Sequence, residues 1–121
     1  MAFLDQAEQW AREAGLPDKK IQHIVVAVEE ALANIFQYAY PGGDGTVEIV
    51  CREDSQTLTL EIVDNGLPYN PLTREDPDTT MALDERPIGG LGVYLIKQLM
   101  DTVHYRREGD RNILTLVVEK K

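Results

Sequence analysis

Three segments of the chain carry apolar residues at the three- and four-residue spacing of an amphipathic helix. They are residues 2–14, residues from about 18 to about 40, and residues 91–100. Gly15 provides a natural end for the first segment, and Pro17 with Asp18 a natural start for the second. The second segment has an apolar stripe formed by Ile21, Ile24, Val25, Val28, Leu32, Ile35 and Phe36. We therefore predict three helices, of which the second is long and amphipathic.

Four other segments are predicted to be strands, and the first two of them alternate apolar and polar residues as strands with one buried face do. They are residues 46–53, 57–64, 102–107 and 112–119. The short link at residues 54–56 predicts that the first two strands pair as an antiparallel hairpin, and residues 108–111 join the other two. Between these pairs, residues 67–88 contain prolines and many charges without a sustained period, which predicts a long loop of the kind that forms lids.

This order of elements predicts an α+β fold for a single domain spanning residues 1–121. We expect a two-layer α/β sandwich in which helices cover one face of a mainly antiparallel, mixed sheet. No apolar stretch approaches the roughly 20 residues that span a bilayer, and the N-terminus lacks a signal-peptide pattern. A formal net charge of −9 argues against direct binding of nucleic acid.

The chain has one cysteine, Cys51, which cannot form an internal disulfide. Together with the missing signal peptide, this predicts a cytoplasmic protein with no membrane partner. Because Cys51 falls within a predicted strand, we interpret it as a small core or edge residue and not as a nucleophile.

Glu30, Asn34 and Tyr38 are spaced by four residues and therefore share one face of the second predicted helix. At about 100° per residue, this face lies well away from the apolar stripe. The simplest interpretation is a set of solvent-facing side chains. The alternative is a site in which the Glu30 carboxylate acts as a general base and the Asn34 amide oxygen helps to hold Mg²⁺ against phosphates.

Asp64 and Gly66 end the second predicted strand and also allow two interpretations. Asp64 could cap a turn in which Gly66 adopts a positive φ. Alternatively, Asp64 could accept a hydrogen bond from an exocyclic amine such as that of adenine, and Gly66 would then let the ring approach the backbone. The spacing of the two residues does not choose between these roles.

A glycine-rich segment, Gly89-Gly90-Leu91-Gly92, opens the third predicted helix. Glycines at a helix start expose several backbone amides, which form an anion-binding site. The alternative role is a flexible hinge and helix cap. The chain contains neither a P-loop nor the protein-kinase signature set, so a phosphate site here would belong to another class.

These motifs together resemble those of the GHKL ATPase superfamily, and most closely those of its anti-sigma-factor serine kinase family. Residues 30–34 (Glu-Ala-Leu-Ala-Asn) resemble the N box of that family. Residues 64–71 resemble its first glycine box in the form common to this branch, and residues 88–96 resemble the second. The resemblance runs from about Leu16 to the end of the chain and implies binding of ATP with Mg²⁺.

The family implies a role for each motif residue. Glu30 would be the base that polarises the attacking hydroxyl, and Asn34 would hold Mg²⁺ against the phosphates. Asp64 would bind the adenine amine, and Gly66 would make room for the ring. The other nucleotide contacts would come from the second glycine box and from an ATP lid at residues 70–88, and the residues expected to make them are Tyr38, Arg86, Gly89, Gly90, Leu91 and Gly92.

The family also implies two protein partners. The substrate would be a serine on an anti-anti-sigma protein of the STAS type, and a sigma factor would be sequestered by the same kinase. Pro68 stands where histidine kinases usually have a second glycine, which favours the anti-sigma branch. Tyr38 is a departure, because many members of the family carry histidine at that position.

A second departure is that family members usually have one or two strands before the first helix. Their absence here predicts an uncovered sheet edge, and therefore self-association as a homodimer. Two alternatives to an active serine kinase remain open. One is a regulatory binding module that binds nucleotide or a partner without phosphotransfer, and the other is the ATP-binding part of a split histidine kinase.

Overall fold

The computed structural model describes residues 2–42, 45–73 and 91–121. Its α-helices are α1 (Ala2–Glu13), α2 (Asp18–Asn34) and α3 (Leu91–Leu99). Its strands are β1 (Val47–Glu53), β2 (Thr57–Asp64), β3 (Thr102–Glu108) and β4 (Arg111–Glu119). Two short helical turns are also present, the π-helical η1 (Ile35–Ala39) and the 3₁₀-helical η2 (Pro71–Thr73). Every predicted helix and strand is therefore found, and the second predicted helix divides into α2 and η1.

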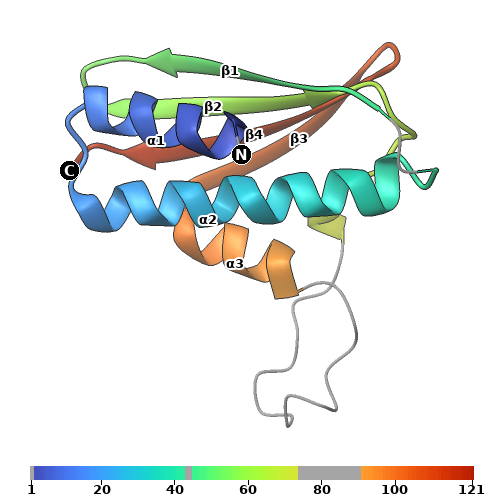
Figure 1. The fold of residues 1–121 in the computed structure, drawn as a ribbon, viewed down its shortest axis with the longest axis horizontal. Coiled ribbons are helices and arrows are strands. Elements are labelled where there is room, and N and C mark those ends of the chain that lie inside the picture. The colour runs from blue at the N-terminus through green and yellow to red at the C-terminus, as the bar shows by residue number, and fades with distance from the viewer. Residues whose placement is uncertain (1, 43–44, 74–90) are drawn as a thin grey trace, which may run out of the picture.

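The strands form one sheet in the order β1-β2-β4-β3, and every neighbouring pair is antiparallel. β1 pairs with β2 and β3 pairs with β4 as hairpins, while β4 returns to the centre of the sheet beside β2 (Figure 1). The predicted α+β fold with two layers is confirmed. Among the described strands, however, the sheet is antiparallel throughout and not mixed.

Side-chain and backbone chemistry explains where the elements end. The β1–β2 turn is closed by Asp54, whose Oδ1 accepts hydrogen bonds from the N–H groups of Gln56 and Thr57, both at 2.7 Å. These hydrogen bonds favour the ionised carboxylate and lower the pKa of Asp54. Gly15 ends α1 and Gly109 turns between β3 and β4, with φ values of 81° and 58° that favour glycine.

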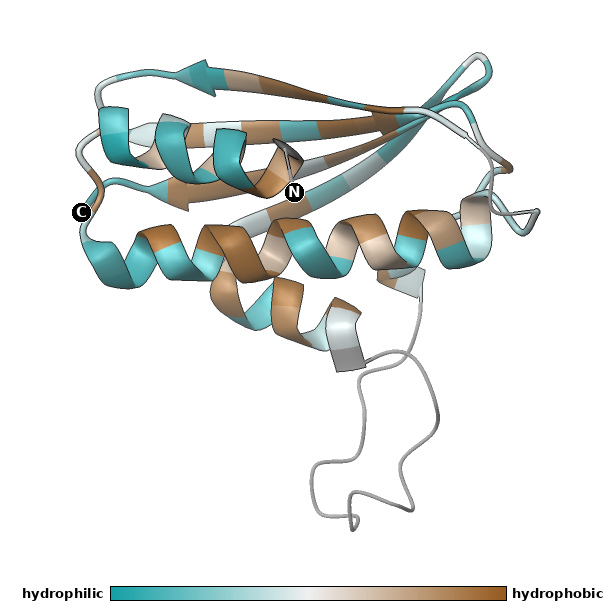
Figure 2. Ribbon diagram, in the orientation of Figure 1, coloured by the Kyte–Doolittle hydropathy of each residue, from teal (hydrophilic) through white to brown (hydrophobic). Residues whose placement is uncertain are grey.

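The strand register gathers the apolar residues on one face of the sheet. Leu60, for example, lies between Cys51 of β1 and Leu116 of β4. This face and all three helices share a single hydrophobic core, visible as the apolar positions along β2, β4 and the helices in Figure 2. The largest fully buried side chains are Ile21, Ile24, Val28, Leu58, Leu60, Ile62, Val93, Ile96 and Leu116. Burying each of them contributes roughly 1.5–3 kcal/mol, so the core determines which ends of α2, β2 and β4 meet.

α2 is the central helix and packs against both α1 and α3. Its buried arc is therefore wider than the predicted stripe and includes Ala27 and Ala31. The predicted stripe is wrong at Phe36, which is 38% exposed, and Val25 is only half-buried. None of the described helices combines the length and the apolar content needed to cross a bilayer.

Cys51 lies on the inward face of β1, an edge strand of the described sheet, and is half-buried against the core. Burial raises the pKa of its thiol, and the negative charges of Glu53 and Glu13 raise it further. A raised pKa lowers the fraction of reactive thiolate, which agrees with a structural role.

Candidate functional site

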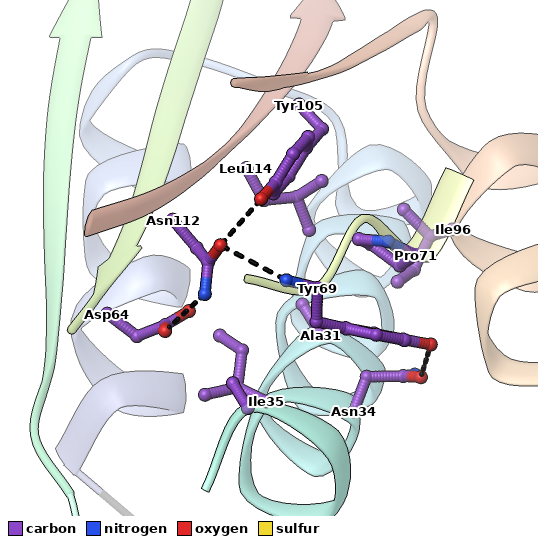
Figure 3. A pocket seen from close by; sticks show the side chains of 11 residues that line it. Ala31, Asn34, Ile35, Asp64, Tyr69, Pro71, Ile96, Tyr105, Asn112 and Leu114 are labelled. Atoms are coloured by element: carbon purple, nitrogen blue, oxygen red, sulfur yellow. Dashed lines mark hydrogen bonds between the residues drawn. The ribbon is translucent and has the colours of Figure 1, made fainter. Parts of the chain in front are cut away.

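A small cavity lies between α2 and the ends of β2 and β4 (Figure 3). Its volume is about 20 Å³, which is room for about one water molecule. Most of its wall is apolar, and its polar atoms come from a carboxylate, two amides and two tyrosines. The lining residues are Ala31, Asn34, Ile35, Ala39, Asp64, Tyr69, Pro71, Ile96, Tyr105, Asn112 and Leu114. The predicted residues Asn34 and Asp64, which are 30 positions apart, therefore border the same space.

Asp64, the last residue of β2, presents a buried carboxylate to this cavity and is only 3% exposed. Its Oδ1 accepts hydrogen bonds from the backbone N–H of Gly66 at 2.9 Å and from Asn112 Nδ2 at 2.8 Å. Within the described part of the chain, no donor reaches its Oδ2. A buried carboxylate oxygen without a donor is costly, so this atom is suited to accept an N–H from a ligand.

Asn112, near the start of β4, is the site residue that sequence reasoning missed. It pairs with Asp64 across the sheet and is 4% exposed. Its Nδ2 donates to Asp64 Oδ1 and to the carbonyl oxygen of Leu67, both at 2.8 Å. Three groups donate to its Oδ1: the backbone N–H of Tyr69 at 3.3 Å, the hydroxyl of Tyr105 at 2.6 Å and the guanidinium of Arg107 at 3.2 Å. Asn112 thereby ties the segment after β2 to the β3–β4 hairpin (Figure 3).

Gly66 lies against the end of η1, where a side chain would not fit. A Cβ at this position would lie 2.5 Å from the carbonyl oxygen of Ala39 and 2.8 Å from its Cβ. The neighbouring Leu67 N–H donates to the same oxygen at 2.8 Å. The positive φ expected for Gly66 in a turn is wrong, because among the described residues only Gly15 and Gly109 adopt one. The close approach that Gly66 permits in this structure is to η1.

The change Gly66→Ala should destabilise the protein by about 1–3 kcal/mol, because the new methyl group meets backbone atoms that cannot rotate away. Gly42→Ala is the matched control, since a Cβ there meets nothing within 4 Å. Thermal unfolding of the two variants checks this expectation. The melting temperature should fall by several degrees for Gly66→Ala and stay within about a degree or two for Gly42→Ala. Equal melting temperatures would contradict the assigned contact.

Glu30 and Asn34 lie one turn apart on α2 and are half-buried against the first turn of α3. The Asn34 Nδ2 donates to the Glu30 carbonyl oxygen at 3.0 Å. A Cβ on Gly92 would collide with Glu30 Oε2 and would lie 3.5 Å from Asn34 Nδ2. The interpretation of Glu30 and Asn34 as solvent-facing side chains is therefore wrong, because α3 packs over them. Because Gly92 has no side chain, the Glu30 carboxylate can reach the start of α3.

Tyr69 connects Asn112 of β4 with Asn34 of α2. Its backbone N–H donates to Asn112 as described, and its ring stacks on Tyr38 with centroids 4.8 Å apart and planes at 22°. Its hydroxyl donates to Asn34 Oδ1 at 3.4 Å. Tyr38, expected to contact nucleotide, thus contacts Tyr69. Tyr69 also lines the cavity of about 20 Å³, and a ligand larger than water requires part of that wall to move.

Three of the predicted site residues, Arg86, Gly89 and Gly90, lie outside the described residues. The same holds for most of the predicted lid at residues 70–88. Leu91 is the first residue of α3, as predicted. The structure therefore brings together Glu30, Asn34, Tyr38, Asp64, Gly66 and Gly92, with Tyr69 and Asn112 between them.

Comparison with known families gives a match over residues 2–118 to the histidine kinase-like ATPase domain. The chain belongs to this family. It is 34% identical over 119 residues to the serine-protein kinase RsbW of Listeria monocytogenes, covering 92% of this chain and 74% of that protein. It is 32% identical over 94 residues to the serine/threonine-protein kinase BtrW of Bordetella bronchiseptica, covering 77% of this chain and 66% of that protein. The predicted place in the GHKL superfamily, in its anti-sigma-factor serine kinase branch, is confirmed.

A solved structure shows the same fold at lower sequence similarity. The histidine kinase AdeS of Acinetobacter baumannii superposes with a TM-score of 0.57 at 20% identity. The match covers 84% of this chain and 47% of that protein. At this identity the match supports the arrangement of helices and strands, and the family assignment rests on the sequence relatives.

Proposed function

We propose that this protein is an ATP- and magnesium-dependent protein-serine kinase of the anti-sigma type. The observation that carries the proposal is the buried Asp64 carboxylate in the wall of an apolar cavity, whose Oδ1 accepts two N–H donors while no described residue donates to Oδ2. A buried acceptor beside an apolar wall is the chemistry that would bind a flat heterocycle with an N–H donor at one edge. Its relatives named as serine-protein kinases point to the same chemistry.

The base-binding end would use Asp64 and the apolar wall. Asp64 Oδ2 would accept a hydrogen bond from the exocyclic amine of adenine, and Ile35 and Leu114 would contact the ring faces. The carboxylate acceptor and the apolar wall fit adenine chemically, but the cavity volume of about 20 Å³ is too small to admit the ring. Outward movement of Tyr69 and Pro71, both in the wall, is the simplest way to enlarge the cavity.

The phosphate end would use Asn34 and the start of α3. The amide Oδ1 of Asn34 is a suitable hard-oxygen ligand for magnesium, and Tyr69 would have to release it. Bound magnesium would neutralise the charge on the phosphates and align them for transfer. Backbone amides at the N-terminus of α3 would supply further positive potential, which matters in a chain with a net charge of −9.

Glu30 would act on the acceptor. Its carboxylate already reaches the first turn of α3 beside Gly92, so it lies where the terminal phosphate is expected. There it would accept the proton of a serine hydroxyl as the oxygen attacks phosphorus, leaving phosphoserine and ADP. Positioning and electrostatics would supply most of the rate enhancement, as is usual for phosphoryl transfer.

The family suggests the protein partners. The serine would lie on an anti-anti-sigma protein of the STAS type, and the kinase would hold a sigma factor when that partner is phosphorylated. A cytoplasmic location and a homodimer remain predictions of the same proposal.

A second candidate function is a regulatory module without phosphotransfer. The observation that favours it is the small cavity, together with the hydrogen bond from Tyr69 to Asn34 Oδ1 that occupies the proposed metal ligand. In this case Asp64, Asn34 and Glu30 would hold a nucleotide or stabilise the fold, and partner binding alone would regulate the sigma factor.

Phosphotransfer distinguishes these functions. The protein is incubated with ATP labelled at the γ-phosphate, Mg²⁺ and a candidate anti-anti-sigma protein, and the label on the partner is followed over time. Acid-stable label that is lost when the partner's serine is replaced with alanine supports the kinase. Tight partner binding without label supports the regulatory module, and acid-labile label on a histidine would support a split histidine kinase.

A further inference from the structure

The orientation of the Asn112 side-chain amide is determined by its neighbours. Its Nδ2 donates to two hydrogen-bond acceptors, Asp64 Oδ1 and the carbonyl oxygen of Leu67. Its Oδ1 faces two groups that can only donate, the backbone N–H of Tyr69 and the guanidinium of Arg107. A flipped amide would place donors against donors and acceptors against acceptors, so a single orientation satisfies the network.

This orientation decides which oxygen of Asp64 is left for a ligand. Asp64 and Asn112 are direct cross-strand partners, and both are almost fully buried. Oδ1 receives N–H donors from both Asn112 and Gly66, so the carboxylate is held at that oxygen and cannot rotate without losing two hydrogen bonds. Asp64 lines the cavity, and no described residue donates to its Oδ2, which is therefore left as a fixed acceptor for a ligand.

We propose that Asn112 is a positioning residue that makes the site select purines with an amine at C6 over purines with a carbonyl there. The inference rests on the proposed function, because it requires that the cavity binds a nucleoside triphosphate. A fixed acceptor at Asp64 Oδ2 pairs with the C6 amine of adenosine triphosphate. The same acceptor opposes the C6 carbonyl oxygen of inosine triphosphate, and a buried polar mismatch of this kind is strongly selective.

The variant Asn112→Asp tests this role with little change in side-chain shape. It replaces the Nδ2 donor with an oxygen that faces Asp64 Oδ1, so two carboxyl groups must share a proton. Asp64 can then rotate or carry the proton itself, and the atom in the cavity wall is no longer held as an acceptor. The preference for adenosine over inosine triphosphate should therefore fall, whatever happens to overall affinity.

Tyr105→Phe is the matched control. It also removes one hydrogen bond from Asn112, the 2.6 Å bond from the Tyr105 hydroxyl, but on the Oδ1 side that faces away from Asp64. Asn112→Ser is a second variant, which removes the amide donor without adding a charge. Circular dichroism and thermal unfolding select the variants that are folded before binding is compared.

The experiment measures dissociation constants of the folded proteins for both nucleotides in Mg²⁺ by calorimetry. The unaltered protein should prefer adenosine triphosphate by at least about tenfold, and Tyr105→Phe should keep that ratio. Asn112→Asp and Asn112→Ser should bring the ratio to within about threefold of unity. An unchanged ratio in a folded Asn112 variant, even with both affinities lowered, would show that Asn112 only supports the fold. Failure of the unaltered protein to bind either nucleotide would instead overturn the proposed function.

Discussion

Replacing Glu30 with glutamine should slow phosphotransfer by about 10²–10⁴-fold and leave the affinity for ATP within about threefold of its original value. Glutamine keeps the size and polarity of the side chain beside Gly92, so the packing of α2 against α3 is preserved. What is lost is the ability to accept the serine proton. Single-turnover transfer of labelled phosphate to the partner serine, measured at saturating ATP, separates this effect from binding.

Glu29→Gln is the control for this change. Glu29 is the preceding residue of α2, but it is exposed and borders a different part of the surface, beside Phe3 and Phe36. The Glu29→Gln variant removes the same charge from the same helix, so the general electrostatic effect of the substitution is matched. Transfer at a normal rate by Glu30→Gln, or an equal loss in both variants, would contradict the assignment of Glu30 as the base.

Replacing Asp64 with asparagine should weaken ATP binding by at least about tenfold. Gly66 and Asn112 both donate to Oδ1, so the new amide must keep its oxygen on that side and turn its nitrogen toward the cavity. A donor then faces the donor amine of adenine, and neither group is satisfied. The same geometry predicts a smaller loss for inosine triphosphate, whose C6 carbonyl accepts from that nitrogen.

Asp54→Asn provides the control, because Asp54 also accepts two backbone N–H groups through Oδ1. It is exposed and lies in the β1–β2 turn, at the opposite end of β2 from the cavity. Calorimetric titration of both variants with ATP and Mg²⁺ should show loss of affinity in Asp64→Asn alone. Retained affinity in Asp64→Asn would remove this carboxylate from the site.

Local patterns were sufficient to predict the elements of this fold. Alternation along residues 57–64 predicts which side chains of β2 face the helices, because side chains in a strand point to opposite faces in turn. The pairing of β4 with β2 could not be predicted from such local patterns. This pairing joins segments that are far apart in the chain, and no turn of fixed length connects them.

The sequence predicted the site residues that belong to a recognisable motif. It missed Asn112, which only its position in the strand marks as a site residue. Asp64 was a candidate because an Asp-x-Gly segment ends a predicted strand, and its role in the site came from the resemblance to the first glycine box. Asn112 was missed, although a signal existed: it shares the inward-facing parity of Leu114 and Leu116 and is polar. A polar side chain on an otherwise apolar face must find partners inside the protein, and here its cross-strand partner is Asp64.

Two of the alternative interpretations were wrong because of contacts between distant segments. The positive φ expected for Gly66 followed from its turn-like sequence, whereas the structure needs glycine there because Ala39 comes close. One of the two interpretations of Glu30 and Asn34 placed them on a solvent-facing surface of α2, whereas α3 packs over them at Gly92. In both cases the backbone of another segment lies against the residue. Helical and strand periodicity cannot predict such a contact.

The most direct test of the central claim is titration of the unaltered protein with ATP by calorimetry, once with Mg²⁺ and once with a chelator. The account predicts binding of one ATP per chain that is tighter in Mg²⁺, because Asn34 and the phosphates would share the ion. No binding of ATP under either condition would contradict it. The cavity bordered by Asp64 and Asn34 would then be part of a module that acts through protein contacts alone.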